Sequence, residues 1–158
     1  KSLLRHNDAA SAPEQLTFGA FHTVLEDLNT ESHKVNSVFF ASGKICHEIN
    51  ATLREEANHF GTVIRIEQLY PLPVHEIQEA VSRFPNAKNF YWVQEEPQNM
   101  GAWSYMDTHF RHELGIQLSY VGRIEGASTA GGSAKRHAIE QQRILTKVLD
   151  IAQSESGL

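Results

Sequence analysis

The sequence predicts an α/β fold with three layers, α/β/α, in which a mainly parallel sheet lies between helices. Four short apolar segments with strand character alternate with four segments whose apolar residues recur every three or four positions. Parallel neighbouring strands need crossover connections, and these helices would supply them. A chain of 158 residues with 41% hydrophobic residues can bury one sizeable core, so we expect a single domain.

Composition and charge argue against several classes of protein. The net charge is -5 and no basic run is present, so we expect no nucleic-acid partner. Cys46 is the single cysteine, which fits a reducing intracellular compartment. No apolar stretch approaches the roughly 20 residues that span a bilayer, and residues 1–11 lack the apolar region of a signal peptide, so we expect no membrane partner. The chain begins with Lys, which we interpret as a fragment or a processed product.

The N-terminal part has little periodicity. We expect residues 1–15 to be an arm or linker from a preceding domain, and residues 16–158 to be the α/β domain. The domain begins with an apolar segment whose spacing fits a strand or a short helix, and both remain open. Its apolar residues are Leu16, Phe18, Phe21, Val24, Leu25 and Leu28.

The first two strand–helix units follow directly. The first has a buried strand at 38–41, a turn at 42–44 and a helix with an apolar residue at every fourth position. These residues are Ile45, Ile49, Leu53 and Ala57. The second has a strand at 63–66 and a helix that Pro73 is well placed to open. The inner face of this helix carries Val74, Ile77, Val81 and Phe84.

The third and fourth units repeat the pattern. In the third, a strand at 90–93 leads through a polar loop to a helix that ends at Gly115 and carries Trp103, Met106, Phe110 and Leu114. In the fourth, a strand at 118–121 is followed by a loop at 122–133 rich in Gly, Ser and Thr. The last helix is expected to place Ile139, Leu145, Val148 and Ala152 on its inner side.

Polar residues collect where the predicted strands end. In an open parallel sheet the carboxyl ends of the strands meet at one edge, where ligands and partner surfaces collect. Two cations at this edge, Lys44 and Arg123, together with Ser42, Gly43 and Ser133, form a candidate anion site, because helix N-termini add positive potential there. The alternative is that Lys44 and Arg123 form ion pairs across the sheet edge and bind no ligand, and this alternative stays open. The expected carboxylate partners are Glu67, Glu95 and Glu125.

No catalytic residue is predicted. Glu95 and Glu96 are adjacent, and neighbours on an extended chain point to opposite faces, so a solvated or ion-paired role is favoured over an acid–base pair. Cys46 is either a thiol activated at a helix N-terminus or, more commonly, a small buried hydrophobe. His109 and His112 lack the further ligands that zinc needs, so no metal site is predicted.

Several segments resemble the C-terminal domain of the thiamine diphosphate-dependent 2-oxoglutarate dehydrogenases. The most specific are residues 65–73, Arg-Ile-Glu-Gln-Leu-Tyr-Pro-Leu-Pro, and residues 94–103, Gln-Glu-Glu-Pro-Gln-Asn-Met-Gly-Ala-Trp. The similarity also includes residues 3–6, 42–44 and 120–123, and His137 with Glu140 and Gln141. The resemblance implies a five-stranded mainly parallel sheet with one antiparallel strand, as in the transketolase C-terminal domain. Residues 17–25 would supply the antiparallel strand.

The resemblance also implies a function for a longer parent chain. Members of this family are homodimeric oxidoreductases of a multienzyme complex in the tricarboxylic acid cycle. They decarboxylate 2-oxoglutarate on thiamine diphosphate with Mg²⁺ and pass the succinyl group to a lipoyl-bearing succinyltransferase. The family's cofactor site belongs to another domain, and this chain contains no Gly-Asp-Gly, so we expect it to bind neither thiamine diphosphate nor Mg²⁺ and to be inactive alone. Its location would be the bacterial cytoplasm or the mitochondrial matrix.

On this interpretation the chain is a non-catalytic structural and regulatory domain. Its partners would be other domains of the same polypeptide, the second subunit of the homodimer and the succinyltransferase. The expected interface residues are Glu95, Glu96, Asn99 and Trp103. Two alternatives remain: the same domain of a related thiamine enzyme such as 2-oxoadipate dehydrogenase, and a free-standing small-anion binding module.

One stretch departs from the family pattern. After Arg123, family members often carry a Ser-Pro-Ala element, and some bacterial members have paired arginines at an allosteric acetyl-coenzyme A site. Residues 124–130 contain neither proline nor arginine and add the carboxylate of Glu125. The departure argues against an acyl-coenzyme A site.

Overall fold

The computed structural model describes residues 10, 17, 19–26, 30–129 and 131–154. The elements in chain order are β1 (Val24–Glu26), β2 (Ser37–Ala41), α2 (Lys44–Glu55), β3 (Gly61–Ile66), α3 (Val74–Ser82), β4 (Asn89–Pro97), α4 (Trp103–His109), the π-helix η3 (Phe110–Leu114), β5 (Ser119–Arg123) and α5 (Ala134–Ser154). None of the helices in these ranges combines the length and hydropathy needed to cross a bilayer.

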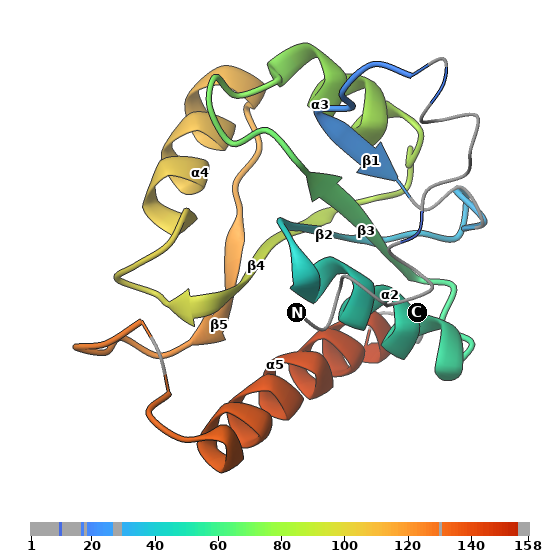
Figure 1. The fold of residues 1–158 in the computed structure, drawn as a ribbon. Helices are drawn as coiled ribbons and strands as arrows, with labels where there is room; N and C mark the ends of the chain where they lie inside the picture. The colour runs from blue at the N-terminus through green and yellow to red at the C-terminus, as the bar shows by residue number, and fades with distance from the viewer. Residues whose placement is uncertain (1–9, 11–16, 18, 27–29, 130, 155–158) are drawn as a thin grey trace.

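The five strands form one sheet in the order β1-β3-β2-β4-β5 (Figure 1). β1 is antiparallel to β3, and the other neighbours are parallel. The prediction of a mainly parallel sheet with one antiparallel strand is therefore confirmed. The antiparallel strand covers only residues 24 and 25 of the expected 17–25 segment and extends one residue past it, to Glu26. Leu16, Phe18, Leu28 and nearly all of the expected arm lie outside the described residues.

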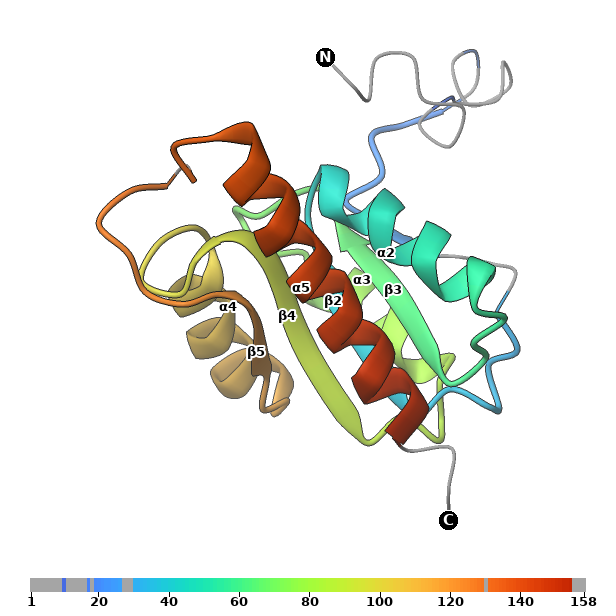
Figure 2. The ribbon, with the colours of Figure 1, turned by 90° about the horizontal axis from the view of Figure 1, so that it is seen from below.

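Helices cover both faces of the sheet. Figure 2 shows α2 and α5 side by side on one face, and α3 and α4 lie on the other. The strands alternate accordingly: Phe39 packs in the cluster below α2 and α5, whereas Phe40 packs with α3, α4 and η3. Both phenylalanines are fully buried, so the sheet separates two apolar clusters.

Two expected helix faces need correction. α2 ends at Glu55, so Ala57 lies beyond the helix, exposed and with φ 48°. In α5, Ile139 is 54% exposed, and the buried positions are Ile144, Val148 and Ala152. Five residues separate Ile139 from Ile144, which is about 500° of helix rotation, so the two side chains point in different directions. The predicted helix end at Gly115 is confirmed, with φ 67° at that glycine.

The third strand is longer than the sequence predicts. β4 continues through Gln94, Glu95 and Glu96 to Pro97, so these residues belong to a strand and not to a strand-to-helix loop. The register with β5 shifts between Val93 and Pro97, and Pro97 stands opposite Arg123. This irregularity accommodates a proline, which has no N–H to donate to the ladder.

α5 is held closely at the amino end of the sheet. A Cβ added at Gly61, the first residue of β3, would lie 3.1 Å from both Ala152 Cβ and Phe39 Cε2. The small residues at both positions therefore allow the last turns of α5 to approach the sheet. With 21 residues, α5 is about 31 Å long and reaches from this edge to the carboxyl ends of the strands.

Candidate functional site at the carboxyl edge of the sheet

Gln94 organises the carboxyl end of β4. Its side chain is 4% exposed, and its Oε1 accepts hydrogen bonds from Trp92 Nε1 at 2.8 Å and from the Trp103 backbone N–H at 3.0 Å. Its Nε2 donates to the carbonyls of Pro97 at 3.1 Å and Met100 at 2.7 Å. One buried amide thus ties the strand, the following turn and the start of α4 together.

Two further contacts tie this turn to the end of β5. The Tyr120 hydroxyl lies 2.9 Å from the Glu96 carbonyl and 2.8 Å from the Arg123 carbonyl. Asn99 Nδ2 donates to the Gly126 carbonyl at 3.1 Å, and the Gly126 N–H donates to Asn99 Oδ1 at 3.0 Å. Hydrogen bonds therefore join the loops that follow β4 and β5, and these polar groups find their partners within the chain.

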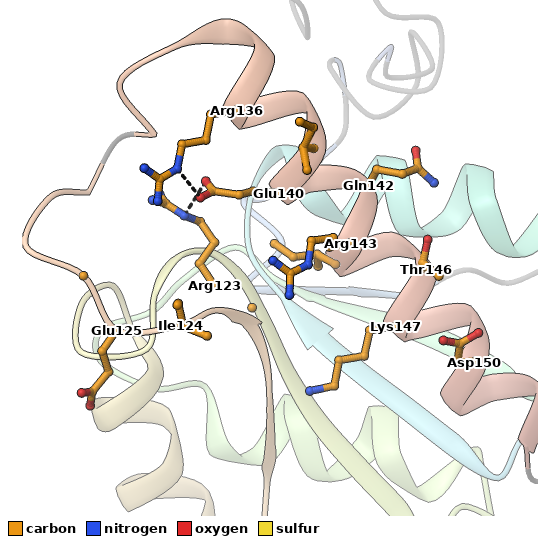
Figure 3. Close-up of a pocket in the computed structure, with 14 residues that line it drawn as sticks. Arg123, Ile124, Glu125, Arg136, Glu140, Gln142, Arg143, Thr146, Lys147 and Asp150 are labelled. Atoms are coloured by element: carbon orange, nitrogen blue, oxygen red, sulfur yellow. Dashed lines mark hydrogen bonds and ion pairs between the residues drawn. The ribbon is translucent and has the colours of Figure 1, made fainter.

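A cavity of about 720 Å³ lies between the end of β5 and the exposed face of α5 (Figure 3). Its cations come from both elements: Arg123, Arg136, Arg143 and Lys147. Ile124 and Ile139, both exposed, add apolar surface, and Glu125, Glu140 and Asp150 add carboxylates. It is larger than a second cavity of about 520 Å³ at the same edge, which is described below.

The cations in this cavity differ in how they are paired. Glu140 contacts Arg123 Nε at 2.8 Å and Arg136 Nε at 3.0 Å, as the dashed lines in Figure 3 show. Arg123 also donates to the Thr129 carbonyl at 2.9 Å. Arg143 and Lys147 form no ion pair within the described ranges, and their side chains extend from α5 toward β5. These two residues are the available positive charges of the cavity.

The residues of the predicted anion site do not come together in one place, and each makes its own contacts. Lys44 is paired with Glu48, whose other carboxylate oxygen contacts Gln141 of α5. Ser133 Oγ accepts the Arg136 backbone N–H at 3.2 Å and so caps α5. Of the predicted set only Arg123 lines the 720 Å³ cavity. The sequence interpretation missed Arg136, Arg143 and Lys147, although their spacing of seven and four places them on one helix face.

The expected carboxylate partners of the two cations also need correction. Glu67 contacts Arg65 Nε at 2.7 Å, and Lys44 and Arg123 pair with Glu48 and Glu140 instead. Lys44 and Glu48 are one helical turn apart, a separation that brings side chains together on any helix. Glu140 reaches Arg123 only because α5 packs beside β5, which the sequence pattern does not reveal.

A second cavity, of about 520 Å³, opens between the carboxyl ends of β2 and β4. After β2 the chain enters α2 on one face of the sheet, and after β4 it enters α4 on the other, so this is the topological switch point where open α/β sheets bind ligands. Its lining includes Ser42, Ile45, Leu69, Tyr70, Glu95, Glu96 and Tyr105. Of the expected interface residues, Glu95 and Glu96 lie here, whereas Asn99 and the Trp103 ring contact Gly126 and Tyr120.

Burial raises the pKa values of two titratable groups near this edge. Burial raises the pKa of the Cys46 thiol to about 12, so this residue packs as a small hydrophobe rather than reacting. Burial likewise raises the pKa of Tyr120 to about 12. His109 contacts Glu113 on the same helical stretch. No cluster of three His, Cys, Asp or Glu side chains suited to a metal ion occurs in the described part of the chain.

The fold and its polar strand ends define a transketolase-like α/β domain. A solved structure titled "Split gene transketolase, inactive beta4 tetramer" matches with a TM-score of 0.52, 15% identity, and coverage of 75% of this chain and 39% of that chain. At this identity the likeness concerns the fold alone. Residues 10–149 match the family model described as 2-oxoglutarate dehydrogenase C-terminal, and the chain belongs to this family.

Curated relatives agree with this assignment. The chain is 41% identical over 150 residues to a 2-oxoglutarate dehydrogenase E1 component of Geobacillus kaustophilus (strain HTA426), which covers 92% of this chain and 16% of the relative. It is 39% identical over 155 residues to that of Shouchella clausii (strain KSM-K16), with 94% and 16% covered. The chain therefore spans about a sixth of the length of these relatives, in agreement with the resemblance seen in its sequence.

Proposed function

We propose that this chain is a non-catalytic domain of a longer 2-oxoglutarate dehydrogenase E1 polypeptide and that it supports the catalytic domains through its carboxyl edge. The parent would decarboxylate 2-oxoglutarate on thiamine diphosphate and Mg²⁺ held by its other domains, and would pass the succinyl group to a lipoyl-bearing succinyltransferase. It would act as an intracellular homodimer within the tricarboxylic acid cycle. The relatives' name and the share of their length that the chain matches support this proposal.

The Gln94 network is the observation that carries the structural role. The buried Gln94 side chain forms its hydrogen bonds with the Trp92 indole and with backbone groups of the adjoining turn, so these hydrogen bonds stay within the chain. Such a network rigidifies a surface and does not supply an acid, a base or a nucleophile. The same edge exposes Leu69 and Tyr70, apolar side chains suited to contact with a neighbouring domain.

The test compares the chain with a full-length parent. Titration calorimetry of the 158-residue chain with thiamine diphosphate and Mg²⁺ is expected to show no binding, and an assay with 2-oxoglutarate is expected to show no turnover. The full-length parent, run in parallel, should show both. Micromolar thiamine diphosphate binding by the isolated chain would overturn the proposal.

A small-anion site is a second candidate function, because Arg143 and Lys147 are unpaired in a cavity of about 720 Å³ within the described ranges. A phosphorylated ligand that gained charge-assisted hydrogen bonds from both could also compete for the Arg123–Glu140 pair. Acetyl-coenzyme A and AMP should be titrated into the wild type, Arg123→Ala and Arg143→Gln. Absence of binding to the wild type, or affinity unchanged in both variants, would remove this function.

A further inference from the structure

We propose that the 520 Å³ cavity at the topological switch point receives an arginine side chain from a polypeptide segment of a partner domain. The inference rests on the proposed interface role of this edge and deepens it, because it names the chemistry of the group that docks. Four features carry it: the position of the cavity, its aromatic wall, its negative charge and its rigid floor.

The aromatic wall comes from two separate parts of the chain. Tyr70, in the loop after β3, is 81% exposed, and Leu69 beside it is 36% exposed. The ring of Tyr70 meets the ring of Tyr105 of α4 edge to face, with centroids 6.5 Å apart. Exposed apolar side chains grouped around a cavity, with polar residues at its rim, are typical of protein-binding surfaces.

The charge at this cavity is negative. Glu95 and Glu96 line it, and neither forms an ion pair with any described residue. No Lys, Arg or His is among the described residues of its lining. Two cations that are close in sequence to other lining residues are paired elsewhere: Lys44 with Glu48 and Arg65 with Glu67. Because adjacent residues of a strand point to opposite faces, an incoming cation meets one of these two carboxylates, and that carboxylate is free of ion pairs with described residues.

Arginine fits this combination better than lysine. A guanidinium is planar, stacks on tyrosine faces and donates two parallel hydrogen bonds to a carboxylate, whereas an ammonium is a compact and strongly hydrated charge. Arginine and tyrosine are also enriched among the residues that dominate binding energy at protein interfaces. The tyrosines beside the carboxylates thus match both parts of an arginine side chain, its apolar stem and its charged head.

The floor of the cavity is fixed before any partner arrives. Trp92 and Gln94 form part of it, and the hydrogen bond between them is 2.8 Å long. Gly101 also lines the cavity with φ 68°, and a Cβ there would lie 2.9 Å from the Gln94 amide. The floor therefore needs little further ordering when a side chain binds, which lowers the entropic cost of binding here.

The test uses blocked pentapeptides with one central residue flanked by leucines. The central residue is arginine, lysine or citrulline, the last being the uncharged isostere of arginine. Binding is followed by NMR of the chain with tyrosine labelled with ¹³C at one ring position. The chain has four tyrosines, so four ring signals are expected. The arginine peptide should shift the Tyr70 and Tyr105 signals and leave Tyr91 unchanged. The citrulline and lysine peptides should bind about tenfold more weakly.

Matched variants locate the site. Glu95→Gln and Tyr105→Ala should each weaken the arginine peptide by about tenfold. Glu125→Gln removes an exposed carboxylate that lines the other cavity, so it should leave the affinity unchanged. Circular dichroism checks that each variant folds.

Three outcomes would overturn the inference: no saturable shift with the arginine peptide, equal binding of the citrulline peptide, or tighter binding of free agmatine than of the arginine peptide. The last would indicate a small-amine site instead of a docking site. Failure of the inference leaves the thiamine diphosphate and turnover results of the proposed function unaffected, so the two can fail separately.

Discussion

At the scale of single residues, the Gln94 amide is the most consequential polar group at the carboxyl edge. Gln94→Leu keeps the volume close but leaves the Trp92 indole N–H, the Trp103 N–H and the Met100 carbonyl without their partner. Each unsatisfied buried group costs about 1–3 kcal/mol, so the three together should lower the free energy of unfolding by at least about 3 kcal/mol. Urea denaturation measures it.

Gln98→Leu is the matched control, since Gln98 lies four residues further on and is exposed. We expect its stability to stay within about 0.5 kcal/mol of the wild type. A Gln94→Leu variant as stable as this control would show that the network adds nothing to stability.

A second residue-scale prediction concerns alkaline pH. Burial raises the pKa of Cys46 from 9.0 to about 12, so between these values the unfolded thiol loses its proton while the folded thiol keeps it. The stabilising contribution is complete below pH 9 and is lost as the pH rises toward 12, by at most about 1.4 kcal/mol per pH unit. Unfolding measured from pH 8 to 11 should show a smaller decline for Cys46→Ala. Identical slopes would contradict the prediction.

The residues explain what the sequence could and could not reveal about the site. Arg123, Glu95 and Glu96 were recognisable because they follow apolar strand segments, and parallel topology brings such positions to one edge. The roles of Gln94 and Glu140 could not be recognised from the sequence, because each depends on a contact that the residue pattern does not reveal. Gln94 donates to the Met100 carbonyl in the turn after β4, and Glu140 pairs with Arg123 of β5.

At the scale of elements, the orientation of α5 is directly testable. Ile144 is 3% exposed and Ile139 54% exposed, although they are the same residue type on one helix. Ile144→Ala should lower the free energy of unfolding by about 2–5 kcal/mol, and Ile139→Ala by about 0.5 kcal/mol or less. Thermal or urea unfolding measures both. Similar losses for the two variants would mean that α5 does not bury Ile144 in preference to Ile139.

Strands and helix centres were predictable at this scale, whereas several ends were not. The period of apolar residues identified β2, β3, α3 and the first part of β4 because those elements bury a continuous face. The third strand was expected to end at residue 93, yet β4 bulges and continues to Pro97 beside β5. Ile139 looked like core because it is aliphatic, but it faces the cavity that contains Arg143.

At the scale of the whole molecule, the two apolar clusters should unfold together because only one sheet separates them. Phe39→Ala and Phe40→Ala remove adjacent, fully buried rings from opposite clusters. Each should cost about 3–5 kcal/mol, and each variant should unfold in a single transition seen at the same urea concentration by far-UV and near-UV circular dichroism. Separate transitions in either variant would show that the two sides of the sheet fold independently.

The overall architecture followed from the sequence to a large degree. Alternating strands and helices imply a parallel sheet with two covered faces, and the family resemblance supplied the antiparallel edge strand. The positions of the two cavities did not follow, because each depends on which helix lies beside which strand end. α5 packs beside β5 and bounds one cavity, and α4 brings Tyr105 to the other.

The two ends of α5 are held by interactions of different kinds, apolar packing at one end and an ion pair at the other. At the amino edge of the sheet, Ala152 packs so near Gly61 that a Cβ added to the glycine would lie 3.1 Å from the Ala152 Cβ, and salt does not weaken apolar packing of this kind. At the carboxyl edge the attachment is ionic, through Arg123 and Glu140. Raising the ionic strength to about 1 M, where the screening length is about 3 Å, should therefore speed amide exchange at residues 137–141 more than at 148–152. A ligand that competes for Glu140 would release the same end of α5, about 18 Å along the helix from the contact at Ala152.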